Sequence, residues 1–308
     1  MKPDWLTRSG FFSFCLNPFD DELLYFGNNI LKPQLMSTIP SVTLSNGVKM
    51  PMLGFGTYLI ADPKVAVDSV LTALEMGYRH IDTAALYYNE EFVGQAIRES
   101  GIPRDDIFVT TKMWNSEHGY DTALRAFDVS MDKLGLDVVD LYLIHWPKPL
   151  NKETWRAFER IYREGRAKAI GVSNFHQHHL EDLFTTAEIK PMVNQVEFHP
   201  YLVQQSLVDF CKTNNIQYEA WSPLMQGKIF NVPFLQQLSI KYQRSIAQIV
   251  LRWNIELGIV TIPKSSTPDR IKSNLDIFDF AMDPADIQKI TQLDKGQRVG
   301  ADPDNFDF

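Results

Sequence analysis

The sequence contains few cysteines and no excess of positive charge, and both facts exclude classes of protein. Cys15 and Cys211 are the only two cysteines in 308 residues, which excludes a disulfide framework or a cysteine-based metal cluster and fits a reducing, cytoplasmic compartment. The formal net charge of −8 gives no support for a nucleic-acid or anionic-membrane partner. No run approaches the roughly 20 apolar residues that span a bilayer. With 44% hydrophobic and 22% charged residues, the composition is that of an ordinary globular protein.

The fingerprints of common nucleotide-binding folds are missing as well. GFGTYL (54–59) lacks the third glycine of G-x-G-x-x-G, and the sequence has no P-loop motif. A nucleotide would therefore have to be bound by other means.

Residues 1–36 differ in character from the rest of the chain. FFSFCL (11–16) is too short for a typical signal peptide, lacks a small-residue cleavage site and is followed by an acidic stretch. Regular patterning begins after Met36. We expect residues 1–36 to be a disordered or non-native N-terminal extension and residues 37–308 to form a single domain. The alternative is an ordered extra element, because the stretch is rich in aromatic residues.

From residue 42 onward, strand-like and helix-like segments alternate. The opening stretch contains Asn46-Gly47, a strong hairpin signal in which both turn residues are expected to adopt positive φ. The strand-like segments that follow are 53–57, 80–84, 107–112, 138–146, 167–174, 192–198, 216–224 and 258–265. The helix-like segments are 63–76, 90–100, 121–134, 153–164, 177–184, 205–214, part of 234–257, and stretches beginning near Thr267 and Pro284. This alternation predicts a parallel sheet with right-handed crossovers, and its length favours a closed barrel over a doubly wound sheet.

Four ionisable residues follow the strand-like segments. Asp82 and Tyr87 occur in GYRHIDTAALYYNEE, Lys112 in IFVTTKMWN and His145 in VVDLYLIHWP. Because the carboxyl ends of barrel strands meet at one mouth, we expect the four to lie together. Tyr87 could donate a proton with its pKa lowered by Lys112, Asp82 could keep Lys112 charged, and His145 could orient a carbonyl. An Asp–Lys structural pair, a core tyrosine and a packed histidine are the alternatives for the single residues.

A second group of residues suits a nucleotide. IPKSSTPDRIKSN (262–274) runs from a strand end into a helix start, with Thr267 suited to the N-cap and Pro268 to the first helical position. Backbone N–H groups there, with Lys264, Ser265 and Arg270, would form a phosphate cradle. A solvated, basic helix start is the alternative.

Polar and aromatic residues at three further strand ends could complete such a site. Trp221 could stack on a flat ring, while Ser173, Asn174 and Gln195 could bond a carboxamide. Ordinary strand-end polarity is the alternative for each residue.

The HQHH run (176–179) is the one group of metal-capable side chains that stands out. It lies on a helix-like segment, outside the expected strand ends. We therefore interpret it as surface and predict no metal, against the rival possibility of a metal-dependent hydrolase.

Several long motifs resemble the aldo-keto reductase family in order and spacing. They are GYRHIDTAALYYNEEFVG, VTTKMWN, DLYLIHWP, GVSNF, NQVEFHP and IPKS…RIKSN, and the likeness covers about residues 42–308. The microbial branch that the chain most resembles includes glyoxal and methylglyoxal reductases, 2,5-diketogluconate reductases and a protozoan prostaglandin F synthase. The resemblance implies a (β/α)8 TIM barrel whose bottom is closed by an N-terminal β-hairpin, and NADPH bound across the strand ends.

The resemblance also implies a role for each candidate residue. Tyr87 would be the proton donor, with Asp82, Lys112 and His145 completing a catalytic tetrad. Ser173, Asn174 and Gln195 would hold the carboxamide of the cofactor, Trp221 would stack on its nicotinamide, and Lys264, Ser265 and Arg270 would clamp the 2′-phosphate that distinguishes NADPH from NADH. The implied cofactor contacts are Gly56, Thr57, Asp82, Ser173, Asn174, Gln195, Trp221, Ser222, Leu224, Lys264, Ser265, Arg270 and Asn274. Tyr58, Trp114 and His145 would line the substrate pocket.

Two departures from larger family members bear on the substrate. The loop between His145 and the helix near Glu153 is short, and so is the C-terminal tail RVGADPDNFDF (298–308). We therefore expect an open mouth and NADPH-dependent reduction of small aldehydes and ketones by a monomeric enzyme. The alternative function is a nucleotide-binding regulatory subunit with the same fold.

Overall fold

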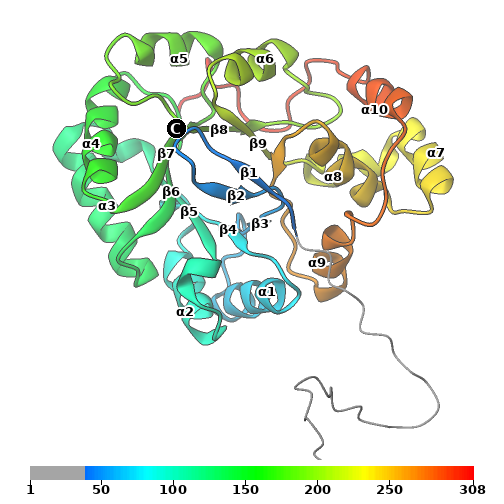
Figure 1. The fold of residues 1–308 in the computed structure, drawn as a ribbon, viewed down its shortest axis with the longest axis horizontal. Helices are drawn as coiled ribbons and strands as arrows, with labels where there is room; N and C mark the ends of the chain where they lie inside the picture. The colour runs from blue at the N-terminus through cyan, green and yellow to red at the C-terminus, as the bar shows by residue number, and fades with distance from the viewer. Residues whose placement is uncertain (1–38) are drawn as a thin grey trace, which may run out of the picture. The chain divides into compact units, whose positions relative to one another are not determined.

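Eight parallel strands form the centre of the fold and run in chain order around a barrel (Figure 1). The computed structural model describes residues 39–308, so the expected extension over residues 1–36 lies outside the described residues and stays a prediction. The barrel strands are β3 (Phe55–Gly56), β4 (His80–Asp82), β5 (Phe108–Met113), β6 (Val139–Ile144), β7 (Ala167–Ser173), β8 (Val193–Glu197), β9 (Gln217–Trp221) and β10 (Val260–Thr261), and the hairpin strands are β1 (Ser41–Thr43) and β2 (Lys49–Pro51). Parallel bridges from Leu53 to Thr261 and from Gly56 to Lys264 join the first barrel strand to the last. The predicted (β/α)8 barrel is confirmed.

Helices form an outer ring, and at least one follows each barrel strand (Figure 1). They are α1 (Pro63–Glu75), α2 (Glu90–Glu99), α3 (Tyr120–Leu134), α4 (Asn151–Arg163), α5 (Gln177–Phe184), α6 (Gln205–Thr213), α7 (Pro233–Tyr242), α8 (Ile246–Glu256), α9 (Pro268–Leu275) and α10 (Pro284–Thr291). The expected helical region within 234–257 is thus two helices. The chain turns between them because Gln243 adopts a left-handed φ of 52° and the Ser245 hydroxyl then caps α8. None of the helices in residues 39–308 is both long and apolar enough to cross a bilayer.

The antiparallel hairpin β1–β2 lies across one end of the barrel (Figure 1). The expectation of positive φ at both turn residues is wrong, because Gly47 has a φ of 89° and Asn46 does not share it. Gly47 N–H donates to the Leu44 carbonyl (2.9 Å), so a tight turn is followed by one left-handed glycine. The Asn46 side chain donates to the carbonyl of Lys168 (2.8 Å), close to the start of β7. The hairpin is therefore fastened to the end of the barrel at which the strands begin.

The barrel strands are buried along their length, as their near-continuous apolar runs predict. Every residue of β5 and β6 is buried. In β6, Tyr142 stacks on Phe158 of α4 with ring centroids 4.5 Å apart, which packs the helix against the sheet. The polar residues Asp82, Lys112 and Ser173 are also buried, and each is the last or second-to-last residue of its strand. The fold thus collects polar side chains at the carboxyl end of the barrel, opposite the hairpin.

Candidate active site

The four ionisable residues predicted to lie together meet at this end of the barrel. Lys112 Nζ lies 2.6 Å from Asp82 Oδ1 and donates to the Thr83 carbonyl (2.9 Å). It also lies 3.4 Å from the Tyr87 hydroxyl. Tyr87 reaches this position because β4 leads directly into the short 3-10 helix η1 (Ala85–Tyr87). A phenol, an ammonium and a carboxylate therefore form one hydrogen-bonded series.

Burial and neighbouring charges determine the protonation states of Tyr87 and Lys112. Burial raises the pKa of the Tyr87 phenol to about 12, although the Lys112 ammonium acts to lower it. Lys112 therefore lowers the Tyr87 pKa as expected, but burial outweighs this effect, and the phenol keeps its proton at neutral pH. Burial is the largest single influence on Lys112 and acts to lower its pKa. The charge and hydrogen bond of Asp82, together with Tyr87 and Glu219, outweigh burial, and the pKa is raised. Lys112 is thus held as a buried cation behind a protonated phenol.

His145 completes the group as a neutral imidazole. Its ring lies edge-on to Tyr87, with centroids 5.7 Å apart, and to Trp114, at 5.2 Å. Burial, followed by the charge of Lys112, holds the pKa of His145 well below its usual range. Its buried Nδ1 has no hydrogen-bond partner within the described part of the chain. A neutral imidazole can donate one hydrogen bond to a carbonyl oxygen without adding a second charge to the site.

A second buried carboxylate, Glu219, lies behind the tetrad and was missed in the sequence. The Gln195 amide nitrogen donates to both Asp82 Oδ2 (2.8 Å) and Glu219 Oε2 (3.0 Å). Burial, and after it the negative charge of Asp82, raises the pKa of Glu219 to about 8. A charged residue within the strand-like segment 216–224 was the signal that could have identified it.

Replacing Glu219 by glutamine should change the pH dependence of stability. A carboxyl with a pKa of about 8 in the folded protein and 4.5 as its model value binds more protons when folded. Wild-type stability should therefore fall as the pH rises between these values, and this loss should be absent in Glu219→Gln. We expect the variant's melting temperature, relative to wild type, to rise by at least about 2–4 °C between pH 5 and pH 9. The exposed Glu153→Gln is the control, and an equal difference at both pH values would contradict the burial of a proton on Glu219.

The three residues predicted to bond a carboxamide are brought together on β7 and β8. The Ser173 hydroxyl and the Asn174 backbone N–H both donate to the Gln195 carbonyl, each at 2.8 Å. The Asn174 side chain donates to the His145 carbonyl (2.9 Å) and accepts from Trp221 Nε1 (2.8 Å). The trio, the predicted stacking ring and the tetrad therefore share one hydrogen-bonded cluster.

The predicted phosphate cradle lies at the start of α9. Thr267 and Pro268 occupy the N-cap and first helical positions as predicted, but the Thr267 side chain makes no capping bond. Instead the buried Ser265 hydroxyl accepts from the Thr267 N–H (3.1 Å). Lys264 and Arg270 are exposed, and neither pairs with a carboxylate among residues 39–308. Two exposed cations at a helix N-terminus suit the binding of an anion.

The remaining predicted cofactor contacts lie at the ends of β3 and β9 and on α9. Gly56 pairs with Asp82 and bridges to Lys264, while the Thr57 hydroxyl donates to the Asp82 carbonyl (2.9 Å). Beyond β9, Ser222 adopts a left-handed φ of 51° and leads to the half-buried Leu224. Asn274 is buried one turn after Arg270 on α9.

Aromatic rings line the mouth of the site. Tyr58, 50% exposed, lies with its ring centroid 5.0 Å from that of Tyr87. Trp114, whose ring lies edge-on to that of His145, is stacked on Phe308, the last residue of the chain, with ring centroids 5.9 Å apart. Phe306 packs on Trp146 at 4.9 Å. The short C-terminal tail therefore reaches the mouth, and the expectation of an open mouth is wrong on this side.

The tail, residues 298–308, is held along its length and is called the strap below. At its start, buried Glu197 of β8 accepts from the backbone N–H groups of Val299 (2.5 Å) and Gly300 (3.2 Å). A Cβ at Gly300 would come within 2.4 Å of the Trp221 ring, so the strap packs directly on the predicted stacking residue. At its end, Lys148 Nζ donates to the backbone oxygen of Phe308 (2.7 Å). None of these strap contacts was predicted from the sequence.

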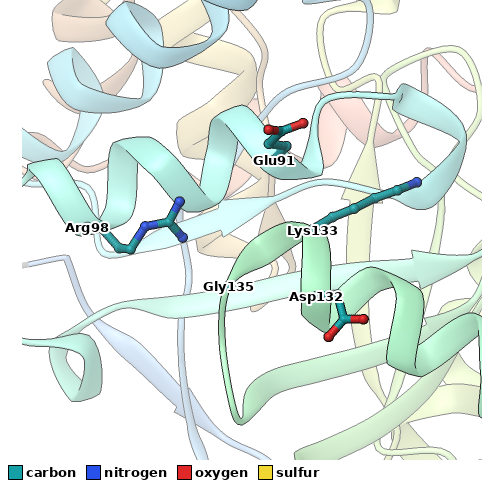
Figure 2. Close-up of a pocket in the computed structure, with 5 residues that line it drawn as sticks. All are labelled: Glu91, Arg98, Asp132, Lys133 and Gly135. Carbon is teal, nitrogen blue, oxygen red and sulfur yellow. The ribbon is translucent and has the colours of Figure 1, made fainter.

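A hollow between α2 and α3 lies on the outer ring of helices (Figure 2). It is lined by Glu91, Arg98, Asp132, Lys133 and Gly135. Arg98 Nη1 donates a hydrogen bond to the carbonyl of Leu134, the last residue of α3 (2.8 Å). The hollow therefore reflects packing between two helices and contains none of the predicted site residues.

Comparisons with known proteins agree with this geometry. Residues 52–295 match the aldo/keto reductase family. The chain belongs to this family. Glyoxal reductase of Bacillus subtilis is 53% identical over 269 residues, which cover 87% of this chain and 98% of the relative.

Two solved structures from the same family share the fold. The crystal structure of an aldo-keto reductase from a Medee basin deep-sea metagenome library has a TM-score of 0.85 and 49% identity, and the match covers 87% of this chain and 100% of that one. The crystal structure of Bombyx mori aldo-keto reductase in complex with NADP has a TM-score of 0.82 and 36% identity, with 87% and 96% covered. The resemblance stated from the motifs, including its microbial branch, is confirmed.

Proposed function

We propose that this aldo/keto reductase reduces small aldehydes and ketones to alcohols with NADPH. The single observation that carries the proposal is the position of Lys112, which is bonded to Asp82 at 2.6 Å and lies 3.4 Å from the Tyr87 hydroxyl at the mouth of the barrel. A structural Asp–Lys pair would not need a protonated phenol and a neutral imidazole beside it.

The residues of the chain fit NADPH. Lys264 and Arg270 are exposed at the start of α9 with no carboxylate partner in residues 39–308, which suits the 2′-phosphate. Gly56 approaches the Ile262 carbonyl so closely that a Cβ would lie 3.1 Å from it. Because glycine has no side chain, a cofactor could approach the backbone closely at this position. The Bombyx mori relative was crystallised with NADP. Ser173, Asn174 and Gln195 would hold the carboxamide, and Trp221 would pack on the nicotinamide ring.

The tetrad would provide acid catalysis. The residues above would hold NADPH, whose chemistry would be the donation of a hydride to the carbonyl carbon. Tyr87 gives its proton to the carbonyl oxygen, and Lys112 stabilises the phenolate that remains. Asp82 keeps Lys112 charged, and His145 donates a hydrogen bond that orients the oxygen. Solvent then returns the proton to Tyr87.

The pocket walls favour a small substrate. Tyr58, Trp114 and His145 lie around Tyr87, and Phe308 closes the side next to Trp114. The relative from Bacillus subtilis is a glyoxal reductase, a small-dicarbonyl enzyme by its name. We therefore propose glyoxal and methylglyoxal as representative substrates. We also propose that the enzyme is a monomer and acts in the cytoplasm.

A panel of carbonyl compounds tests this proposal. We expect loss of NADPH absorbance with glyoxal and methylglyoxal at kcat/KM of about 10⁴ M⁻¹s⁻¹ or higher, and at least about tenfold lower values with a steroid ketone. Binding of NADPH without consumption by any member of the panel would contradict the enzyme proposal and favour the regulatory-subunit alternative.

A further inference from the structure

Three histidines and one carboxylate meet where the start of α5 faces the strap. His176, His178 and His179 and the strap residue Asp304 each offer one ligand atom, and these atoms lie within 4.8 Å of one another. Asp304 Oδ2 lies 2.8 Å from His176 Nδ1, and Asp304 Oδ1 lies 3.0 Å from His178 Nε2 and 3.4 Å from His179 Nε2. None of the four belongs to the tetrad or to the proposed cofactor contacts. The interpretation of HQHH as plain surface is therefore incomplete.

We propose that this cluster is a divalent transition-metal site that takes zinc. Three imidazole nitrogens and one carboxylate oxygen are ligands that zinc accepts in tetrahedral geometry. With metal–ligand bonds of about 2.0–2.2 Å, the ligand atoms of a tetrahedron are about 3.4 Å apart. The separations from the Asp304 oxygens lie between 2.8 and 3.4 Å, and no separation in the cluster exceeds 4.8 Å, so loading needs side-chain movements that shorten the widest separation by at most about 1.4 Å.

The cluster is both accessible and partly held in place. The His178 and Asp304 side chains are 60% and 46% exposed, so an ion can reach them from solvent. The His176 and His179 side chains are 20% and 19% exposed, and the His179 ring packs on Phe175 with centroids 5.7 Å apart. Two fixed ligands and two accessible ones are a reasonable arrangement for a site that exchanges its ion.

Hydrogen bonds in the metal-free cluster compete with the ion. Arg298 Nη2 donates to His176 Nε2 (2.8 Å), and the His176 backbone N–H donates to His179 Nδ1 (3.1 Å). Binding through His176 Nδ1 and His179 Nε2 moves a ring proton onto each of these accepting nitrogens. Arg298 must then turn away, and Gln204 Oε1 is within reach at 3.3 Å. Arg298 is thus a built-in competitor that keeps the affinity moderate.

A bound ion would tie the strap to the barrel. Asp304 lies just before Phe306 and Phe308, whose rings pack on Trp146 and Trp114 at the mouth. Loading would therefore fix the segment that walls the substrate pocket. Any effect on substrate affinity rests on the proposed function, whereas binding of the ion does not.

Titration with Zn²⁺ and Co²⁺ tests the proposal. The full chain, without a histidine tag and treated with a chelator, is titrated with Co²⁺ while its visible spectrum is recorded, and with Zn²⁺ in a calorimeter. We expect one ion per chain and the intense visible absorption of tetrahedral Co²⁺, which Zn²⁺ displaces. His178→Ala and Asp304→Asn each alter a ligand and should raise the Kd by at least about 10–100-fold, the loss that follows removal of a group that only orients a ligand. Arg298→Met should lower it.

Matched controls separate this site from adventitious binding. Gln177→Ala lies within the same run and should leave the Kd unchanged, and melting temperatures of all variants report whether they fold. Absence of saturable binding would overturn the proposal. Binding that is the same in wild type, His178→Ala and Asp304→Asn would also overturn it, because the ion would then lie elsewhere.

Discussion

Tyr87→Phe is expected to lower kcat for carbonyl reduction by about 10²–10⁴-fold, the usual contribution of a general acid. The substitution removes the proton that Tyr87 holds with a pKa of about 12 and leaves the ring. Contacts of that ring with Tyr58 and His145, at 5.0 and 5.7 Å, are retained, so the protein should fold and bind NADPH nearly as the wild type does. Steady-state turnover with glyoxal, together with NADPH binding followed by fluorescence, measures both.

The adjacent tyrosine provides a matched control. Tyr88 is 80% exposed, so Tyr88→Phe should leave kcat unchanged. Near-wild-type turnover by Tyr87→Phe would remove the proton donor from the proposed mechanism. Equal losses in both variants would show that the phenol at position 87 has no special role.

Removal of the two exposed cations at the start of α9 is expected to have the second large effect. Lys264→Ala with Arg270→Ala should raise the KM for NADPH about 100-fold, since each charge-assisted hydrogen bond contributes about 1.5–3 kcal/mol. The KM for NADH should change little because NADH lacks the 2′-phosphate. Initial rates with both cofactors at a fixed aldehyde concentration give the two values.

Lys272→Ala is the control on the same helix. Lys272 is exposed and lies 3.1 Å from Asp276, away from the cradle. It should leave the KM for NADPH unchanged. Equal increases in the KM values for NADPH and NADH in the double variant would show that Lys264 and Arg270 do not bind the 2′-phosphate.

The barrel was predictable because its signals are local and repeated. Eight buried apolar runs alternate with amphipathic segments, and the carboxyl ends of parallel strands must meet. That rule alone brings Asp82, Lys112 and His145 together. The hairpin was predicted correctly, but the φ of Asn46 was not. In the turn that forms, only Gly47 has a positive φ, and the Asn46 side chain donates a hydrogen bond to the Lys168 carbonyl of β7.

What could not be predicted depends on contacts between distant parts of the chain. The Asn115 side chain donates to the backbone oxygen of Phe308 across 193 residues, and no periodicity in the sequence predicts that contact. The Tyr87 pKa is likewise set by burial as well as by Lys112, and burial is a property of the folded barrel. A short tail therefore suggested an open mouth where the strap in fact supplies an aromatic wall.

Deuterium transfer tests the proposed reaction most directly. NADPH deuterated at both C4 positions of the nicotinamide is incubated with glyoxal and the enzyme, and the product is examined by mass spectrometry. Direct hydride transfer at this site predicts glycolaldehyde with one deuterium on its carbinol carbon, formed by wild type and nearly lost in Tyr87→Phe. Product without deuterium, or bound NADPH with no product, would contradict the assignment of this chain as a carbonyl reductase.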